Sequence, residues 1–288
     1  MTELERLVAA ELSAPVDPRV AQLATAIAAK HGEASRAVLF YGSCLRERQL
    51  DGLMLDFYLI VSHYRAAYGK NWLALANRLI PPNVFFFEAA GMRAKYAVLS
   101  EEHFHRLNGA ETGSVSVWAR FAQPSRLVWA ADDDARKTAI AAISRAAPTL
   151  LAAAMPVVGT PADPLDLWRG AFSLTYSAEL RAERAGRSQS VVDIDRDRYR
   201  RFYKAAIKEA ASLPSGPSWR SRRLQGKALS VLRLAKASAT FVGGVDYIAW
   251  KINRHAGTDI HIKPWQRRWP LLAAISLLPR LLRSGAVR

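Results

Sequence analysis

The residues best suited to chemistry lie in two apolar stretches, residues 37–41 and 54–61. Gly42 and Ser43 directly follow the first stretch, and Asp56 is the only carboxylate in the second. A Gly-Ser turn after a strand lets the backbone approach a ligand closely, with its N–H groups and the hydroxyl directed at phosphate oxygens. A carboxylate in so apolar a strand is costly unless a metal ion or a cation satisfies it. The pattern fits a phosphate-binding turn beside a magnesium ligand, or an ordinary hairpin in a mixed sheet.

Charged residues in other apolar segments extend this chemistry. Lys95 and Arg120 open or interrupt such segments, where a cation is rarely placed without an anion, so we expect them to neutralise phosphate charge. The alternative is that they extend to solvent from an edge strand. A second magnesium ligand would be Glu88 or Asp51, because position 58 is a tyrosine and one carboxylate alone makes a poor Mg²⁺ site.

The elements that must position these residues form a mixed α/β pattern followed by helices. Strands are predicted over residues 37–41, 54–61, 84–87 and 94–99, and the segments 118–121 and 125–129 flank Gln123-Pro124. Helices are predicted over 3–12, 18–31 and 72–79, and another begins at Ser100, which is followed by two acidic residues. From residue 132 the pattern is mainly helical, with helices over 135–154, 164–184, 195–211 and 222–254. The sequence therefore predicts an α/β (α+β) fold with a helical C-terminal domain.

Charge is distributed unevenly along the chain. The formal net charge is +16, yet residues 1–180 carry 18 Lys and Arg against 18 Asp and Glu, whereas residues 181–288 carry 23 against 7. A neutral body with a basic last third indicates a polyanionic partner, either nucleic acid or an anionic membrane. The single cysteine, Cys44, excludes an internal disulfide framework; it is either a buried thiol or a catalytic nucleophile, and no Cys/His pairing is visible near it.

The C-terminal segment combines tryptophan, cations and an apolar run. Trp265 and Trp269 lie beside Arg267 and Arg268, and the run LLAAISLL follows. Tryptophan at the headgroup level, leucine among acyl chains and arginine on lipid phosphates make an interfacial anchor, although a terminal helix docked on the core has the same pattern. The N-terminus lacks the pattern of a signal peptide, and no uninterrupted apolar run reaches the roughly 18 residues that span a bilayer. We therefore expect a peripheral protein on the cytoplasmic side of the inner membrane.

Six segments between residues 40 and 252 occur in an order typical of one family. They are FYGSCL at 40–45, MLDFYLIV at 54–61, AKYAVLSEEHF at 94–104, WARFAQPSRLV at 118–128, FSLTYSAELR at 172–181 and SRRLQGKALSVLRLAKASATFVGGVDYIAWKI at 221–252. In this order they resemble motifs of the mitochondrial-type CTP:phosphatidate cytidylyltransferases, the translocator assembly and maintenance family. That family makes CDP-diacylglycerol peripherally at a membrane.

The resemblance implies a polymerase-beta-like nucleotidyltransferase fold. It also implies transfer of CMP from CTP to phosphatidate, with pyrophosphate as the leaving group and magnesium as the cofactor. Carried onto this chain, it assigns nucleotide binding to Tyr41, Gly42, Ser43 and Arg46, catalysis to Asp56, Lys95 and Arg120, magnesium to Asp56 and Glu88, and the lipid phosphate to Glu179, Arg181 and Lys227, with Arg233 and Lys236 as further candidates.

The chain also departs from the family's motifs. The second glycine of its GSG turn is Cys44 here, its GD pair is Ala178-Glu179, and its WH…N…HYS run is reduced to Trp72. These departures leave two alternatives open: a nucleotidyltransferase acting on RNA or another phosphorylated acceptor, and an inactive membrane-bound relative. We expect a nucleotidyltransferase domain over residues 1–131, a helical domain over 132–258 and an amphipathic membrane-surface segment over 259–288.

Overall fold

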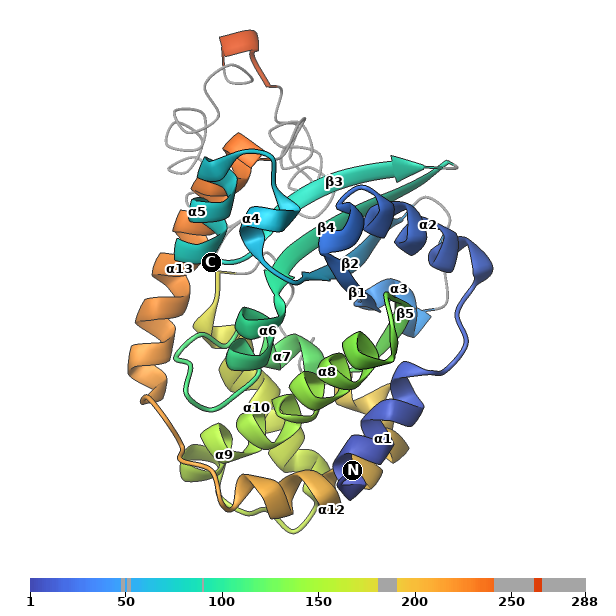
Figure 1. Cartoon of the computed structure of the whole chain (residues 1–288). Coiled ribbons are helices and arrows are strands. Elements are labelled where there is room, and N and C mark those ends of the chain that lie inside the picture. The colour runs from blue at the N-terminus through green and yellow to red at the C-terminus, as the bar shows by residue number, and fades with distance from the viewer. Residues whose placement is uncertain (48–49, 51–52, 90, 181–190, 241–261, 266–288) are drawn as a thin grey trace.

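A five-stranded mixed sheet covered by helices forms the protein in the computed structural model (Figure 1). The structure describes residues 1–47, 50, 53–89, 91–180, 191–240 and 262–265. Its strands are β1 (Ser35–Tyr41), β2 (Met54–Val61), β3 (Asn83–Ala89), β4 (Met92–Ser100) and β5 (Ser125–Ala130). The predicted mixed α/β fold with a helical C-terminal part is confirmed.

The strand order is β3-β4-β2-β1-β5. β2 and β4 are parallel, and the other three pairs are antiparallel. A parallel pair needs a crossover connection, and α4 (Tyr64–Ala67), α5 (Asn71–Leu79) and edge strand β3 lie between β2 and β4 in the chain. This crossover places β4, and with it Lys95, directly beside β2.

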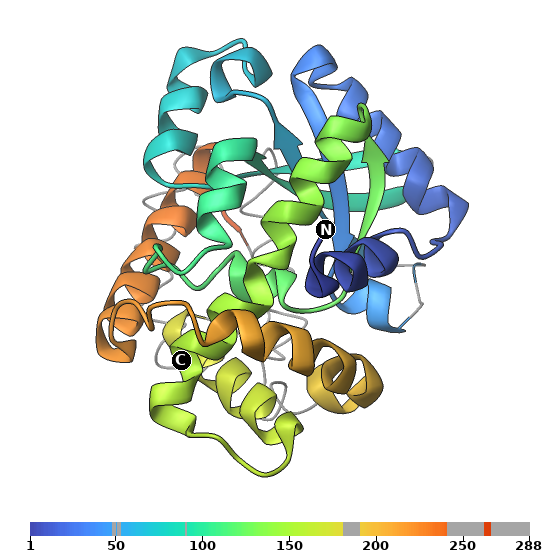
Figure 2. The same ribbon diagram turned by 60° about the horizontal axis from the view of Figure 1, so that its bottom comes forward.

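The two central strands are apolar because both faces of the sheet are buried. Alternate residues of β1 and β2, such as Phe40 and Phe57, pack with α2 (Pro18–Ala29) on one face. Leu39, Tyr58 and Ile60 point to the other face and join the core of the helical part. Figures 1 and 2 show the C-terminal helices grouped beneath this second face.

Capping residues set the starts of several helices. Thr2 and Glu5 form a capping box on α1 (Glu3–Leu12), and Asp17 caps α2 ahead of a proline in its first turn. Ser100 accepts a hydrogen bond from the His103 N–H and caps α6 (Glu101–Leu107), as its sequence predicts. The short α3 (Ser43–Glu47) follows β1 directly.

The helical part comprises α7 (Trp118–Phe121), α8 (Asp133–Ser144), α9 (Ala146–Val158), α10 (Pro164–Ala178), α12 (Arg196–Ala210) and α13 (Trp219–Thr240). α10 ends at Ala178, earlier than predicted, and Glu179 has extended backbone. α13 begins three residues before the predicted start at 222, and its predicted extension beyond 240 lies outside the described residues.

One helix in the described part of the chain is long and apolar enough to cross a membrane by length and composition alone. It runs from Asp133 to Val158, through α8 and α9, and 67% of its apolar window is buried inside the protein. α9 contacts α7, α10 and α12. Its apolar composition is that of a core helix.

Candidate anion-binding pocket

Strand register brings three sequence-predicted residues into one row. Tyr41 of β1 pairs with Asp56 of β2, which pairs with Lys95 of β4. Paired residues in adjacent strands project to the same face, so the three side chains meet on the face that carries the helical part. Lys95 Nζ lies 2.9 Å from Asp56 Oδ1. Two residues that are 39 positions apart in the sequence thus form an ion pair.

Gly42 packs directly against Asp56. Its φ is +98°, a region that favours glycine, and a Cβ built on it would lie 2.9 Å from Asp56 Oδ2. Ser43 then begins α3, and Arg46 lies on this short helix. The close approach at this turn is to the Asp56 carboxylate, and the predicted approach to a phosphate stays a prediction.

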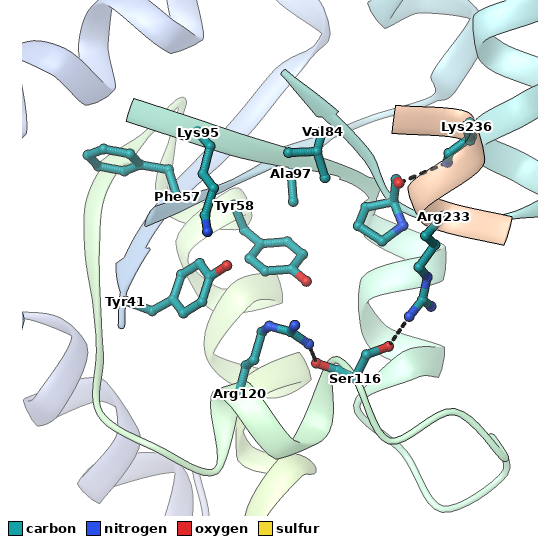
Figure 3. A pocket seen from close by; sticks show the side chains of 11 residues that line it. Tyr41, Phe57, Tyr58, Val84, Lys95, Ala97, Ser116, Arg120, Arg233 and Lys236 are labelled. Carbon is teal, nitrogen blue, oxygen red and sulfur yellow. Dashed lines mark hydrogen bonds between the residues drawn. The ribbon is translucent and has the colours of Figure 1, made fainter. Parts of the chain in front are cut away.

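A pocket of about 200 Å³ lies beside this row (Figure 3). Four cations from three elements, β4, α7 and α13, line it together with two phenols, a serine and apolar residues. The lining residues are Tyr41, Phe57, Tyr58, Pro82, Val84, Lys95, Ala97, Ser116, Arg120, Arg233 and Lys236. Figure 3 shows Lys95 and Arg120 directed toward the rings of Tyr41 and Tyr58, with Arg233 and Lys236 at the opposite end. Such a concentration of cations favours an anionic ligand.

Buried contacts fix the two arginines of the pocket. Arg120, on α7, donates to the carbonyl of Ser116. Arg233, on α13, donates to the Ser116 hydroxyl at 2.8 Å and to the Pro81 carbonyl at 2.8 Å, and its Nη1 lies 3.8 Å from Glu179 Oε1. Arginine stays protonated in proteins, so both positive charges persist at any relevant pH.

Lys236 is a cation of the pocket whose pKa lies near neutrality. Its ammonium donates to the carbonyls of Ile80 and of Pro82, the latter at 2.8 Å. Burial, followed by the charge of Arg233, lowers the pKa of Lys236 to about 7. Its charge therefore changes within the physiological pH range, and an anion beside it would favour the protonated form.

The aromatic side of the pocket contains the tyrosine that stands two residues after Asp56. Tyr58 is on the same face as Asp56 because strand residues alternate, and its ring lies 5.3 Å from that of Tyr41 and 5.2 Å from that of Phe121. Burial raises the pKa of Tyr41, so its phenol is neutral. Tyr58 thus forms a wall of the pocket, at a sequence position where a carboxylate could have been a second magnesium ligand.

The described residues fit a magnesium ion carried by a nucleotide better than one held by the protein alone. Asp56 Oδ1 is buried, and its contact with Lys95 has the distance of an ion pair but not the angles of a hydrogen bond. A further ligand would reach this carboxylate oxygen only when Lys95 moves away from it. Among the described residues no three His, Cys, Asp or Glu side chains gather as a metal site. Mg²⁺ commonly combines one or two carboxylates with water and substrate phosphates, which matches Asp56 alone.

The structure does not bring Glu88 to Asp56, contrary to the predicted shared metal site. Glu88 pairs with Arg93 of β4, and Arg93 pairs with Met54 of β2. It therefore lies two strands across from β2, about 10 Å, and two residues along from the row of Asp56. Its carboxylate is half exposed and 4.0 Å from the Arg93 guanidinium. The sequence places Glu88 at the end of an apolar strand but cannot show that β4 separates the two.

The structure places the described residues predicted to bind a lipid phosphate in different surroundings. Glu179 is buried beside Arg233, where it orients a cation instead of binding an anion. Lys227 is exposed on α13, six residues before Arg233, and residues at that spacing point to different sides of a helix. Arg181 and Asp51 lie outside the described residues, as do Arg267, Arg268 and Trp269. Trp265 is described and 44% exposed.

Sequence reasoning missed Ser116 and the carbonyls of residues 80–82. Ser116 is buried, donates or accepts a hydrogen bond with Ser114 at 2.9 Å and accepts one from Arg233. Ser116 lies in a loop whose sequence has no periodic pattern. The carbonyls of residues 80–82 belong to the backbone, so the residue types at these positions do not indicate their role. Only the two basic positions that contact them, 233 and 236, could indicate this end of the pocket.

No protein-family model matches the chain, and no curated protein matches it. Fold and site together define a mixed α/β protein with a helical C-terminal part and a cationic pocket on one face of the sheet.

Proposed function

We propose that this protein is a peripheral-membrane nucleotidyltransferase that transfers CMP from CTP to phosphatidate, giving CDP-diacylglycerol and pyrophosphate. The observation that carries the proposal is the contact of Gly42 with Asp56 at the edge of a pocket lined by four cations. A carboxylate, a close backbone turn and several cations are the groups that nucleotidyl transfer requires. The motif order described above supports cytidine and phosphatidate as the substrates.

In this reaction a phosphatidate oxygen forms a bond to the α-phosphorus of CTP, and the bond from that phosphorus to the β-phosphate oxygen breaks. Phosphate is already a nucleophile at neutral pH, so no strong general base is needed. The turn at Gly42 and Ser43 would hold the triphosphate, and Lys95 and Arg120 would neutralise the charge that moves to pyrophosphate. Arg233 and Lys236 would hold the phosphate of the acceptor. Magnesium, held by Asp56 and phosphate oxygens, would add charge neutralisation.

The size of the pocket limits which parts of the substrates it holds. Its volume of about 200 Å³ is below the roughly 300–1,000 Å³ of sites that enclose a whole small ligand. It therefore suits the reacting phosphates, with the base and the acyl chains outside. The ion pair of Lys95 with Asp56 would open as Lys95 turns to the nucleotide.

That same ion pair favours a second candidate function, a phosphate-ester-binding protein without transferase activity. Lys95 Nζ lies 2.9 Å from Asp56 Oδ1, and among the described residues no three His, Cys, Asp or Glu side chains gather as a metal site. Such a protein would bind the nucleotide or the lipid phosphate through the same cations and release no pyrophosphate.

The test is pyrophosphate release from each of the four ribonucleoside triphosphates with Mg²⁺, with and without phosphatidate vesicles. Asp56→Asn removes the negative charge at nearly constant volume. We expect release with CTP and phosphatidate together, and a loss of about 10²-fold or more in Asp56→Asn. Asp197→Asn is the matched control, because Asp197 is 92% exposed on α12.

Three results would redirect the assignment. Release that requires RNA and ignores phosphatidate would support a nucleotidyltransferase of another substrate class. Stabilisation by CTP against thermal unfolding without any release would support the binding protein. Equal activity in Asp56→Asn and in the wild type would exclude the role given to Asp56.

A further inference from the structure

Two neighbouring helices each expose large apolar side chains. On α5, Trp72, Leu75 and Leu79 recur at spacings of three and four residues and are 49%, 58% and 67% exposed. On α13, Leu224, Val231 and Leu232 are exposed to a similar degree. We call these six residues the α5–α13 face. Spacings of three, four and seven residues place side chains on one side of a helix, so each helix presents an apolar stripe.

The two stripes lie on the same side of the molecule. Figures 1 and 2 both show α5 and the C-terminal half of α13 together. Lys236 of α13 donates to Ile80 and Pro82, at the end of α5, and Arg233 donates to Pro81. Inward residues of α13 and Pro82, just after α5, thus line the pocket, and exposed residues of the two helices form the α5–α13 face.

The two segments of the chain that carry this face have charge of a single sign. Neither residues 57–87 nor residues 210–240 contain an aspartate or a glutamate. Exposed cations accompany both stripes: Arg65, Lys70, Arg78, Arg220, Arg223 and Lys227. An apolar stripe accompanied by cations of the same segments matches the surface of an anionic bilayer, where apolar side chains enter the acyl boundary and cations contact lipid phosphates.

We infer that the α5–α13 face docks on an anionic lipid bilayer and so brings the wall of the pocket to the membrane. The inference rests on the proposed function at one point, that the acceptor of the CMP group is a lipid. The six residues of the face precede the C-terminal tryptophan-containing segment in the sequence. It also gives Lys227 a role, contact with lipid headgroups from outside the pocket.

Vesicle binding of the full chain tests the inference without nucleotide or phosphatidate. Vesicles of phosphatidylcholine, with or without phosphatidylglycerol, are sedimented with the protein. We expect binding only with phosphatidylglycerol, and about ten-fold weaker binding in Leu75→Glu/Leu79→Glu. The matched control is Val157→Glu/Ile194→Glu, which changes two apolar residues of similar exposure, 60% and 57%, outside the face. Equal affinity of the two double variants would overturn the inference.

A site-specific label separates the face from the C-terminal segment. In a Cys44→Ala background, an environment-sensitive dye is attached at Leu75→Cys, or at Asp197→Cys as a control. We expect a blue shift on adding phosphatidylglycerol vesicles at position 75 only. An unchanged spectrum at 75 in protein that sediments with vesicles would overturn the inference. A blue shift at position 75 without vesicles would also overturn the inference. A shift that grows with protein concentration would indicate that a second copy covers the face. A shift that does not depend on concentration would indicate that the chain's own C-terminal segment covers it.

Because these vesicles contain no substrate, the outcome is independent of catalysis. A protein that docks through residue 75 yet releases no pyrophosphate would retain the docking face and lose the proposed reaction.

Discussion

Gly42 couples the backbone after β1 to the Asp56 carboxylate. Replacement by alanine would place a Cβ 2.9 Å from Oδ2 at a φ of +98°, so both the backbone and the carboxylate must shift. We expect Gly42→Ala to lower the free energy of unfolding by about 1–3 kcal/mol and to reduce nucleotide binding. Urea denaturation and thermal shift with CTP measure the two effects.

Gly69→Ala is the control for this prediction. A Cβ on Gly69 meets nothing within 4 Å, and its φ is not in the left-handed region. We expect this variant to be neutral or slightly stabilised. Equal effects of the two substitutions would mean that the contact with Asp56 imposes no requirement for glycine.

Lys236 makes ligand binding depend on pH. Its pKa is about 7 in the folded protein and near 10.5 when unfolded, so the unfolded chain binds the extra proton between these values and stability rises with pH across that window. Below pH 7 the lysine is protonated in both states and adds no slope. An anion needs the protonated form, so we expect affinity for sulfate, which does not titrate here, to fall by up to ten-fold per pH unit above about 7.

Calorimetric titration with sulfate from pH 6 to 9 measures this slope. Lys236→Met should flatten it, whereas Lys227→Met, at an exposed position on the same helix, should leave it unchanged. A slope that persists in Lys236→Met would assign the pH dependence to another group.

Residue types predicted much of the end of the pocket near Lys95 and Arg120. They predicted little of the end that contains Ser116 and Pro82. Asp56, Lys95 and Arg120 were identifiable because a charge inside an apolar segment is costly without a partner. Their partners were not identifiable, because strand order and the β2–β4 crossover decide them. The same crossover separates Glu88 from Asp56.

At the scale of elements, α13 supplies lining residues of the pocket and contacts the loop over residues 112–116, which also reaches the pocket. Arg222 is buried and donates to the carbonyls of Thr112 and Gly113, while Arg233 donates to Ser116 further along the same loop. A Cβ on Gly226 would lie 2.1 Å from the carbonyl oxygen of Ala178, so α13 and the end of α10 are in close contact there. The ordinary helix signals in the sequence predicted α13 but not this contact.

Gly226→Ala tests the contact by the sign of its effect. Helix propensity alone would stabilise α13 by about 1 kcal/mol, whereas the clash with Ala178 should lower the free energy of unfolding and displace Arg233 from Glu179. Urea denaturation gives the sign. Ala228→Gly, on the exposed side of the same helix, calibrates propensity and should cost about 1 kcal/mol. A stabilised Gly226→Ala protein would show that the helices separate without cost.

At the scale of the molecule, one hydrophobic cluster joins the sheet to the helical part. It includes Leu4 of α1, Leu39 of β1, Leu150 of α9 and Tyr199 of α12. Beside it the buried guanidinium of Arg198 pairs with Glu11 and donates to the carbonyl of Ala122 at 3.0 Å. Sequence periodicity predicted which faces of these elements are apolar, but a local pattern cannot show that residues before and after position 131 bury those faces against each other.

This shared core bears on dividing the chain. A polypeptide ending near residue 131 would expose one apolar face of its sheet to solvent. A polypeptide containing the later residues would expose the apolar faces of the helices that cover the sheet. The two pieces would behave like the subunits of an obligate heterodimer, insoluble alone and competent only when made together.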